Sequence, residues 1–418
     1  MSETGSISGW LGRAASEAIS RAVADYNKEQ FRKATIDDPG WRIELIKRDD
    51  GTDPSKAREH ADRFGKARGL NIIIGPAFSG AVGAMQDYTN IPILSYGSTS
   101  PLYSIPDDNI FRMPPDDTGA VQQYVDILRE DGIRNAIIIY RDDPWGQKID
   151  EALRDEIGSV RGVALPDSIK YPTSETSYGA VTDRLAAALG GVTDRANTAV
   201  LLYGFDEIVD ILQAASENPQ LQQDRWYGYG NLPALLDDAN RAAWLERVGY
   251  TTMSVVHVPN EISRHVDSEV EGANIYSYHA YDAVMLAADL INNAQAHSHT
   301  PLTVAQLAEG IEQGRQGPNA LGVPLVFNAN GDLDPDYVYY NIETVSGGEF
   351  VIDSVSAPAK PARVCRQFCA TIAAAHADRR RGRTRRRAEC RSLGAKVPLE
   401  AWPPHHMLNI TRWVDAMA

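Results

Sequence analysis

Short runs of β-branched and apolar residues alternate with amphipathic stretches through most of the chain. This alternation is typical of an α/β fold, in which crossover helices join the strands of a parallel sheet. The run at 71–75 has three consecutive isoleucines and no polar face, which predicts a fully buried strand. The predicted strands are 42–46, 71–75, 91–95, 136–140, 163–169, 198–202 and 226–228, and the predicted helices are 11–28, 54–65, one from Ser79, 117–129, one from Pro144, 178–189 and 206–216.

The pattern changes after Thr251. One strand and two helices are followed by two strands that meet at a Gly-Gly pair, which predicts a β-hairpin. The helix at 11–28 has no strand before it, although a parallel sheet normally has a strand feeding its first helix, so we expect the first strand to be missing. The elements expected in the last part are a strand at 252–258, helices at 272–294 and 304–313, and hairpin strands at 337–343 and 349–355.

Charge is divided unevenly along the 418 residues, whose formal net charge is −15. Residues 359–418 contain 13 Lys and Arg against 4 Asp and Glu, so the remainder has 28 basic and 52 acidic residues and a net charge of −24. A body this acidic should repel phosphates, so we expect no nucleic acid partner. The arginine-rich run 379–387 shows no periodicity, and we expect 357–418 to be a disordered basic tail outside the fold.

Composition also argues against several classes of protein. The three cysteines, Cys365, Cys369 and Cys390, all lie in the tail, which excludes a disulfide framework or a thiolate metal site in the body. Scattered histidines and the absence of a Gly-x-Ser-x-Gly or Walker-type motif argue against an enzyme, although the acidic pairs at 49–50 and 142–143 leave acid–base chemistry as a weaker alternative. We therefore expect no catalytic activity, no metal and no cofactor. The sequence has no apolar run as long as a transmembrane helix, and its start does not resemble a signal peptide.

Several short motifs occur in a fixed order. Together they resemble the leucine/isoleucine/valine-binding family of type I periplasmic binding proteins, which also includes amide and urea receptors. The resemblance covers residues 6–355 and rests on the order and spacing of the set, because no single motif is specific. The motifs are Ala22-Val23-Ala24-Asp25-Tyr26-Asn27, Ile74-Gly75-Pro76-Ala77-Phe78-Ser79-Gly80, Gly97-Ser98-Thr99-Ser100-Pro101-Leu102, Phe111-Arg112, Asp142-Asp143-Pro144-Trp145-Gly146, Tyr281-Asp282-Ala283-Val284 and Phe327-Asn328-Ala329-Asn330-Gly331-Asp332.

The resemblance implies two Rossmann-like lobes with parallel sheets, joined by three hinge crossovers. Lobe 1 would comprise residues 1–116 and 252–327, and lobe 2 residues 117–251 and 328–356. The lobes would close over a ligand by hinge motion. The resemblance further implies a solute receptor of an ABC-type uptake system, a monomer in a periplasmic or extracellular location that works with a membrane permease. A cytoplasmic ligand-sensing regulator of the amide-receptor kind is the alternative.

The expected anchor for the ligand is Ser79 together with the turn after the next strand. Ser79 opens a helix directly after a strand, where its hydroxyl and the N–H groups of Ser79 and Gly80 can bind a carboxylate at the positive end of the helix dipole. Thr99 offers a hydroxyl and an N–H to the same group. Gly97 offers its carbonyl to an ammonium, and its missing side chain allows close approach. The alternative is a simple helix cap and a simple turn.

Aromatic residues occupy the other positions that should face the cleft, where flat rings can close over an apolar group or a cation. Ordinary core packing is the alternative. The branched-chain receptors carry an acidic residue after the strand that ends near Gly228, and this chain has Tyr229 there, unless Asp206 or Glu207 supplies the acid. We therefore expect a small, amino-acid-like ligand that bears a carboxylate or an amide. The aromatic candidates are Trp10 or its neighbour Leu11, Tyr96, Trp145, Phe205 and Tyr229.

Overall fold

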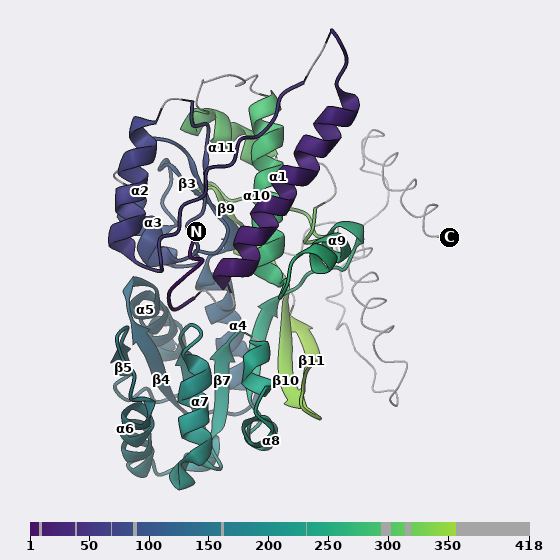
Figure 1. Cartoon of the computed structure of the whole chain (residues 1–418). Helices are drawn as coiled ribbons and strands as arrows, with labels where there is room; N and C mark the ends of the chain where they lie inside the picture. The colour runs from purple at the N-terminus through teal and green to yellow at the C-terminus, as the bar shows by residue number, and fades with distance from the viewer. Residues whose placement is uncertain are drawn as a thin grey trace, which may run out of the picture. The chain divides into compact units, whose positions relative to one another are not determined.

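Two β-sheets organise the computed structural model of the chain (Figure 1). The structure describes residues 1–7, 11–37, 40–67, 69–86, 90–159, 163–230, 232–293, 302–313 and 319–356. The basic tail expected at 357–418 and the candidate residue Trp10 lie outside these ranges. Helices are α1 (Arg13–Lys33), α2 (Pro54–Lys66), α3 (Ser79–Gln86), α4 (Asp117–Glu130), α5 (Pro144–Ser159), α6 (Tyr178–Gly190), α7 (Ile208–Glu217), α8 (Ala239–Arg247), α9 (Glu261–Glu269), α10 (Ile275–Asn293) and α11 (Val304–Gln313).

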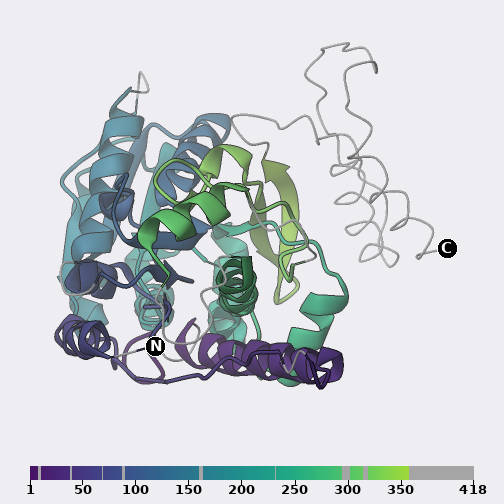
Figure 2. The ribbon, with the colours of Figure 1, turned by 90° about the horizontal axis from the view of Figure 1, so that it is seen from above.

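The smaller sheet has the strand order β1-β2-β3-β9, and its strands are β1 (Ile73–Ile74), β2 (Ile93–Ser95), β3 (Ile110–Pro115) and β9 (Asp332–Leu333). All neighbouring strands in it are parallel. Helices α2 and α3 pack together, and α1 packs along α10. Figure 2 shows α1, in purple, lying beside α10. Because α10 is buried on nearly every side, it forms the centre of the helical packing around this sheet.

The larger sheet has the order β11-β10-β8-β7-β6-β4-β5. Strands β4 to β8 pair in parallel, whereas β10 pairs antiparallel with β8 and with β11. The hairpin predicted near the end of the body is therefore confirmed. The strands are β4 (Asn135–Asp142), β5 (Ile169–Pro172), β6 (Thr198–Tyr203), β7 (Arg225–Tyr229), β8 (Thr251–Val255), β10 (Tyr340–Ser346) and β11 (Glu349–Ser356).

The chain passes between the two sheets three times, which confirms the expected class of fold. It leaves the smaller sheet after β3, returns after β8, and crosses again between β9 and β10. Strand β8 belongs to the larger sheet and β9 to the smaller one, so the second and third passages follow these strands. The division of residues between the lobes at 116, 251 and 327 stays a prediction.

Some local expectations were wrong. Residues 42–46 form no strand, because the side chain of Asn27 bonds both backbone groups of Ile43: Asn27 Nδ2 donates to the Ile43 carbonyl at 3.0 Å, and Ile43 N donates to Asn27 Oδ1 at 2.8 Å. The strand expected at 163–169 begins only at Ile169. Helix α4 is capped by Asp116, whose Oδ1 accepts from Thr118 N at 3.0 Å, although Asp117 was expected to cap it. Within the described ranges, no helix is both long and apolar enough to cross a membrane.

Candidate functional site

Two neighbouring cavities are lined by residues from both sheets and from the segments that follow their strands. The serine-side cavity is lined by Ser79, Gly97, Thr99, Trp145, Phe205 and Tyr229, among others. The hinge-side cavity is lined by Thr99, Asp116, Asp117, Tyr229, His279 and Tyr340, among others. Thr99, Tyr229 and Tyr276 line both cavities, so the two spaces adjoin. Six of the eight residues predicted from the sequence therefore meet around one cavity.

Hydroxyl groups hold the turn that follows β2 against the start of α3. Ser79 is the first residue of α3, and its Oγ accepts from Ser98 Oγ at 3.0 Å and from Ser100 N at 3.3 Å. Ser95 Oγ donates to the Pro76 carbonyl at 2.7 Å. Because Ser79 accepts in both of these bonds, its own hydroxyl proton remains available to a further acceptor.

Gly97 is required by the close approach of two loops. A Cβ atom at this position would lie 2.3 Å from the carbonyl oxygen of Ala77 and 3.2 Å from a methyl carbon of Leu11. The first distance is far below any tolerable contact with a backbone atom. The turn can therefore reach the start of α3 only because residue 97 has no side chain.

Asp117 lines the hinge-side cavity and was not predicted as a site residue. It is the first residue of α4, and its carboxylate accepts from Trp145 Nε1 at 2.8 Å and from Tyr229 Oη at 2.9 Å. Its backbone N–H donates to the Thr99 carbonyl at 2.9 Å. Burial raises the pKa of Asp117 to about 7, against the opposing effect of these donors. The carboxyl group therefore changes charge near neutral pH.

The larger sheet contributes aromatic rings from the ends of its strands. Trp145 stacks on Phe205, with ring centroids 5.2 Å apart and planes at 27°, and meets Tyr229 edge-on at 5.6 Å. The guanidinium of Arg141 lies 4.6 Å from the centroid of Phe205. Arg141 also pairs with Asp143 at 2.8 Å and Glu207 at 2.9 Å. Glu207 is thus engaged by Arg141, whereas Asp206 lines the serine-side cavity.

A model of the family described as "periplasmic binding protein" matches residues 3–348. This chain belongs to the periplasmic binding protein family. The family resemblance inferred from the ordered motifs is thereby confirmed, and the match spans both sheets of this periplasmic binding protein.

Known proteins are similar to this periplasmic binding protein at low sequence identity, and two solved structures share its fold. A leucine-binding protein of Thermotoga maritima aligns at 18% identity and a TM-score of 0.68, covering 86% of this chain and 97% of that one. A solute-binding protein of R. palustris, solved in complex with benzoate, aligns at 17% identity and a TM-score of 0.63, covering 85% and 94%. An uncharacterised protein of Methanocaldococcus jannaschii is 24% identical over 225 residues, which is 51% of this chain and about half (53%) of that protein's length.

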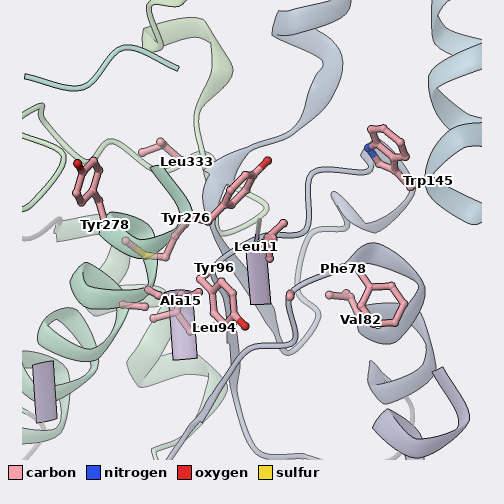
Figure 3. Packing of buried hydrophobic residues seen from close by; sticks show 14 of the residues in the cluster. Leu11, Ala15, Phe78, Val82, Leu94, Tyr96, Trp145, Tyr276, Tyr278 and Leu333 are labelled. Atoms are coloured by element: carbon pink, nitrogen blue, oxygen red, sulfur yellow. The ribbon is translucent and has the colours of Figure 1, made fainter. Parts of the chain in front are cut away.

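Two of the predicted site residues do not join the others in this periplasmic binding protein. Tyr96 is fully buried and lines neither cavity, because its ring packs into the hydrophobic core beside Gly75. Figure 3 shows Tyr96 near Leu94 and below Leu11. Trp10 lies outside the described residues, and its neighbour Leu11 lines the serine-side cavity.

Proposed function

We propose that this periplasmic binding protein is the solute-binding receptor of an ABC-type uptake system, acting as a monomer outside the cytoplasmic membrane with a membrane permease. Its ligand is a small, amino-acid-like solute that bears a carboxylate or an amide. The observation that carries the proposal is the meeting of Ser79, Gly97, Thr99 and the aromatic residues around the serine-side cavity.

The polar side of this cavity suits a carboxylate. Ser79 has a hydroxyl proton to donate, and it begins α3, whose first N–H groups have no partner within the helix. Thr99 adds an N–H from the facing turn, and its hydroxyl bonds the carboxylate of Asp117. No Lys or Arg is among the residues that line the cavity, so recognition of the carboxylate would depend on these neutral donors and on the helix dipole.

The aromatic side suits the rest of the ligand. Trp145, Phe205 and Tyr229 come from the larger sheet, whereas Ser79 and Thr99 come from the smaller one. A ligand held between them would bridge both lobes, and closure would follow from its contacts with both. Leucine and benzoate, the ligands associated with the two similar structures, both carry a carboxylate, which further supports this class of solute.

A panel of amino acids, amides, urea and small aromatic acids tests the proposal. A specific ligand should raise the melting temperature in a thermal-shift assay, because it binds the folded state alone. Titration calorimetry should then show that Ser79→Ala and Thr99→Ala each weaken the best carboxylate ligand by about 1–3 kcal/mol. Ser174→Ala, at an exposed position remote in sequence from both segments, is the matched control. Unchanged affinity in both site variants would remove these residues from the site.

A further inference from the structure

Arg141, near the end of β4, is a buried cation that has no part in the proposed function so far. Its side chain is 8% exposed. Its Nε donates to Asp143 Oδ2 at 2.8 Å, and its Nη1 donates to Glu207 Oε1 at 2.9 Å. The centre of the guanidinium lies 4.6 Å from the centroid of the Phe205 ring, within the range of a cation–π interaction. One side chain therefore contacts both segments that carry Trp145 and Phe205 into the serine-side cavity.

The contact with the Trp145 segment runs through Asp143. Asp143 Oδ1 accepts from Trp145 N at 3.1 Å and from Gly146 N at 2.9 Å, so this carboxylate caps the start of α5. The other oxygen of the same carboxylate accepts from Arg141. Because one carboxylate makes both contacts, the guanidinium fixes where α5 begins and, with it, the backbone of Trp145.

The contact with the Phe205 segment is double. The guanidinium lies over the ring of Phe205, and it also bonds Glu207, which lies two residues further along the turn before α7. Tyr171 Oη donates to the same Glu207 oxygen at 3.0 Å and holds the carboxylate from β5. Because Trp145 and Phe205 stack on each other, both members of the stack depend on the position of Arg141.

A second arginine–aspartate pair in the larger sheet has no such relation to the cavities. Arg195 donates to Asp224 from Nε at 2.7 Å and from Nη2 at 2.8 Å, and the carboxylate is fully buried. Arg195 lies just before β6 and Asp224 just before β7, so this pair stands at the opposite end of the strands from the cavity-lining residues. It therefore provides a structural comparison for Arg141.

We propose that Arg141 is a positioning residue of the ligand site, which holds the segments of Trp145 and Phe205 so that the two rings receive the apolar part of the solute. This inference rests on the proposed function and deepens it. Arginine suits the role, because a planar guanidinium can bond two carboxylates and lie over a ring at once, whereas lysine offers a point charge. The adjacent acids of 142–143 then differ in role, since Asp142 pairs with Lys170 at 3.1 Å.

The position of the rings can be tested without a ligand. The near-ultraviolet circular dichroism of Trp145 is obtained as the difference between each protein and the same protein carrying Trp145→Phe. Arg141→Met should lose most of this signal, because the stack on Phe205 is no longer held. Arg141→Lys should keep part of it, and Arg195→Met, which also breaks a pair with a buried carboxylate, should keep all of it.

Binding is measured by titration calorimetry on the full chain, with leucine and benzoate as probes, at a temperature where every variant is folded. Arg141→Met should weaken the probe that binds by about tenfold, because rings that are not held in place must be ordered on binding. Asp143→Asn keeps an oxygen to cap α5 and weakens the contact with Arg141, so it should cost a few-fold in affinity. Asp142→Asn, at the neighbouring carboxylate, and Arg195→Met should bind like the wild type.

The outcomes separate this proposal from the proposed function. An unchanged Trp145 signal in both Arg141→Met and Asp143→Asn would overturn the positioning role. A loss of affinity in Arg195→Met as large as that in Arg141→Met would also overturn it, because general destabilisation would then explain both. If Arg141→Met does not fold, as judged by far-ultraviolet circular dichroism, Asp143→Asn decides. If no solute of the panel binds the wild type, the proposed function fails, and the Trp145 signal still decides whether Arg141 holds the rings.

Discussion

The smaller sheet contributes hydroxyl and backbone groups to the cleft, whereas the larger sheet contributes aromatic rings. On the first side, which we call the polar wall and which comprises Ser79, Gly97 and Thr99, hydrogen bonds from Ser98 and Ser100 to Ser79 hold the turn, and the approach of Gly97 to the Ala77 carbonyl tolerates no side chain. On the second side, the aromatic wall, Trp145 and Phe205 stack on each other, and the guanidinium of Arg141 lies over the ring of Phe205.

The difference indicates that the polar wall positions the ligand, whereas the aromatic wall adapts to its shape. Hydrogen bonds depend steeply on distance and angle, so the polar wall needs a rigid frame. Stacked rings keep most of their contact when they slide or tilt, so the aromatic wall can adjust to ligands of different shape. Substitutions should therefore be costly on the polar wall and milder on the aromatic wall.

The largest effect should come from Arg112→Ala, which breaks the frame of the polar wall. The variant leaves the buried carboxylate of Asp332 without its partner and releases the Ser100 carbonyl, and it should lower the free energy of unfolding by about 3–5 kcal/mol. Urea denaturation measures the loss. Arg129→Ala, which removes an exposed ion pair with Asp126, should cost less than about 1 kcal/mol. Similar losses in both variants would mean that burial of the Arg112 pair is unimportant.

Gly97→Ala should come next. Its new Cβ would overlap the Ala77 carbonyl, and the turn must move, at a cost of about 1–3 kcal/mol together with loss of ligand binding. Gly158→Ala is the matched control, because Gly158 is an exposed helical residue with nothing near its missing Cβ. That control should be neutral or stabilising by up to about 1 kcal/mol. A Gly97→Ala protein as stable as the control would show that the two loops can separate freely.

Asp117 joins the two walls, and its charge should make stability depend on pH. The unfolded carboxyl loses its proton near pH 4, whereas the folded one keeps it up to about pH 7, because burial raises its pKa. The folded state thus binds more protons between these values, and the contribution of Asp117 to stability falls as the pH rises through this window. Of the groups around it, His279 stays neutral and Tyr229 has a raised pKa, both because of burial.

Asp117→Asn should remove this dependence. Relative to the wild type, the variant should gain roughly 1–2 kcal/mol between pH 5 and pH 7 in urea denaturation curves. Asp155→Asn, at an exposed position on α5, should track the wild type at every pH. Parallel curves for Asp117→Asn and the wild type would show that Asp117 is ionised throughout.

The smallest effect should come from Phe205→Leu on the aromatic wall. The ring is only partly buried, and its loss removes the stack on Trp145 and the contact with Arg141, at a cost of about 0.5–1.5 kcal/mol. The tryptophan emission spectrum should shift, because the environment of Trp145 changes. A loss as large as that of Gly97→Ala would contradict the idea that this wall is adaptable.

Much of this arrangement could be predicted from the sequence. Short β-branched runs alternating with amphipathic stretches located most strands and helices, and the change from an isoleucine-rich strand to Ser79 gave the start of α3. The meeting of Ser79 with Thr99 followed from the rule that parallel strands end at one edge of a sheet.

Other features depend on contacts that periodicity does not contain. Asp116 and Asp117 are equally good capping residues, and only the backbone entering α4 decides that Asp116 caps the helix and that Asp117 bonds Trp145 and Tyr229. Tyr96 directly follows β2, and its ring could face the cleft or the core. Strand β9 is two residues long and lies in a turn-like sequence, and its partner β3 is more than 200 residues away, so no local pattern predicts their pairing.

Strand β9 is translated more than 200 residues after its partner β3, and this order affects how the protein folds during synthesis. Arg112 emerges from the ribosome 220 residues before Asp332, so its guanidinium must stay hydrated while most of the chain is still being made. The smaller sheet cannot complete its strand order from the first 116 residues alone, and nascent chains that stop before β9 should remain sensitive to proteases in this region. Folding of the polar wall is thus postponed until the third passage between the sheets has been translated.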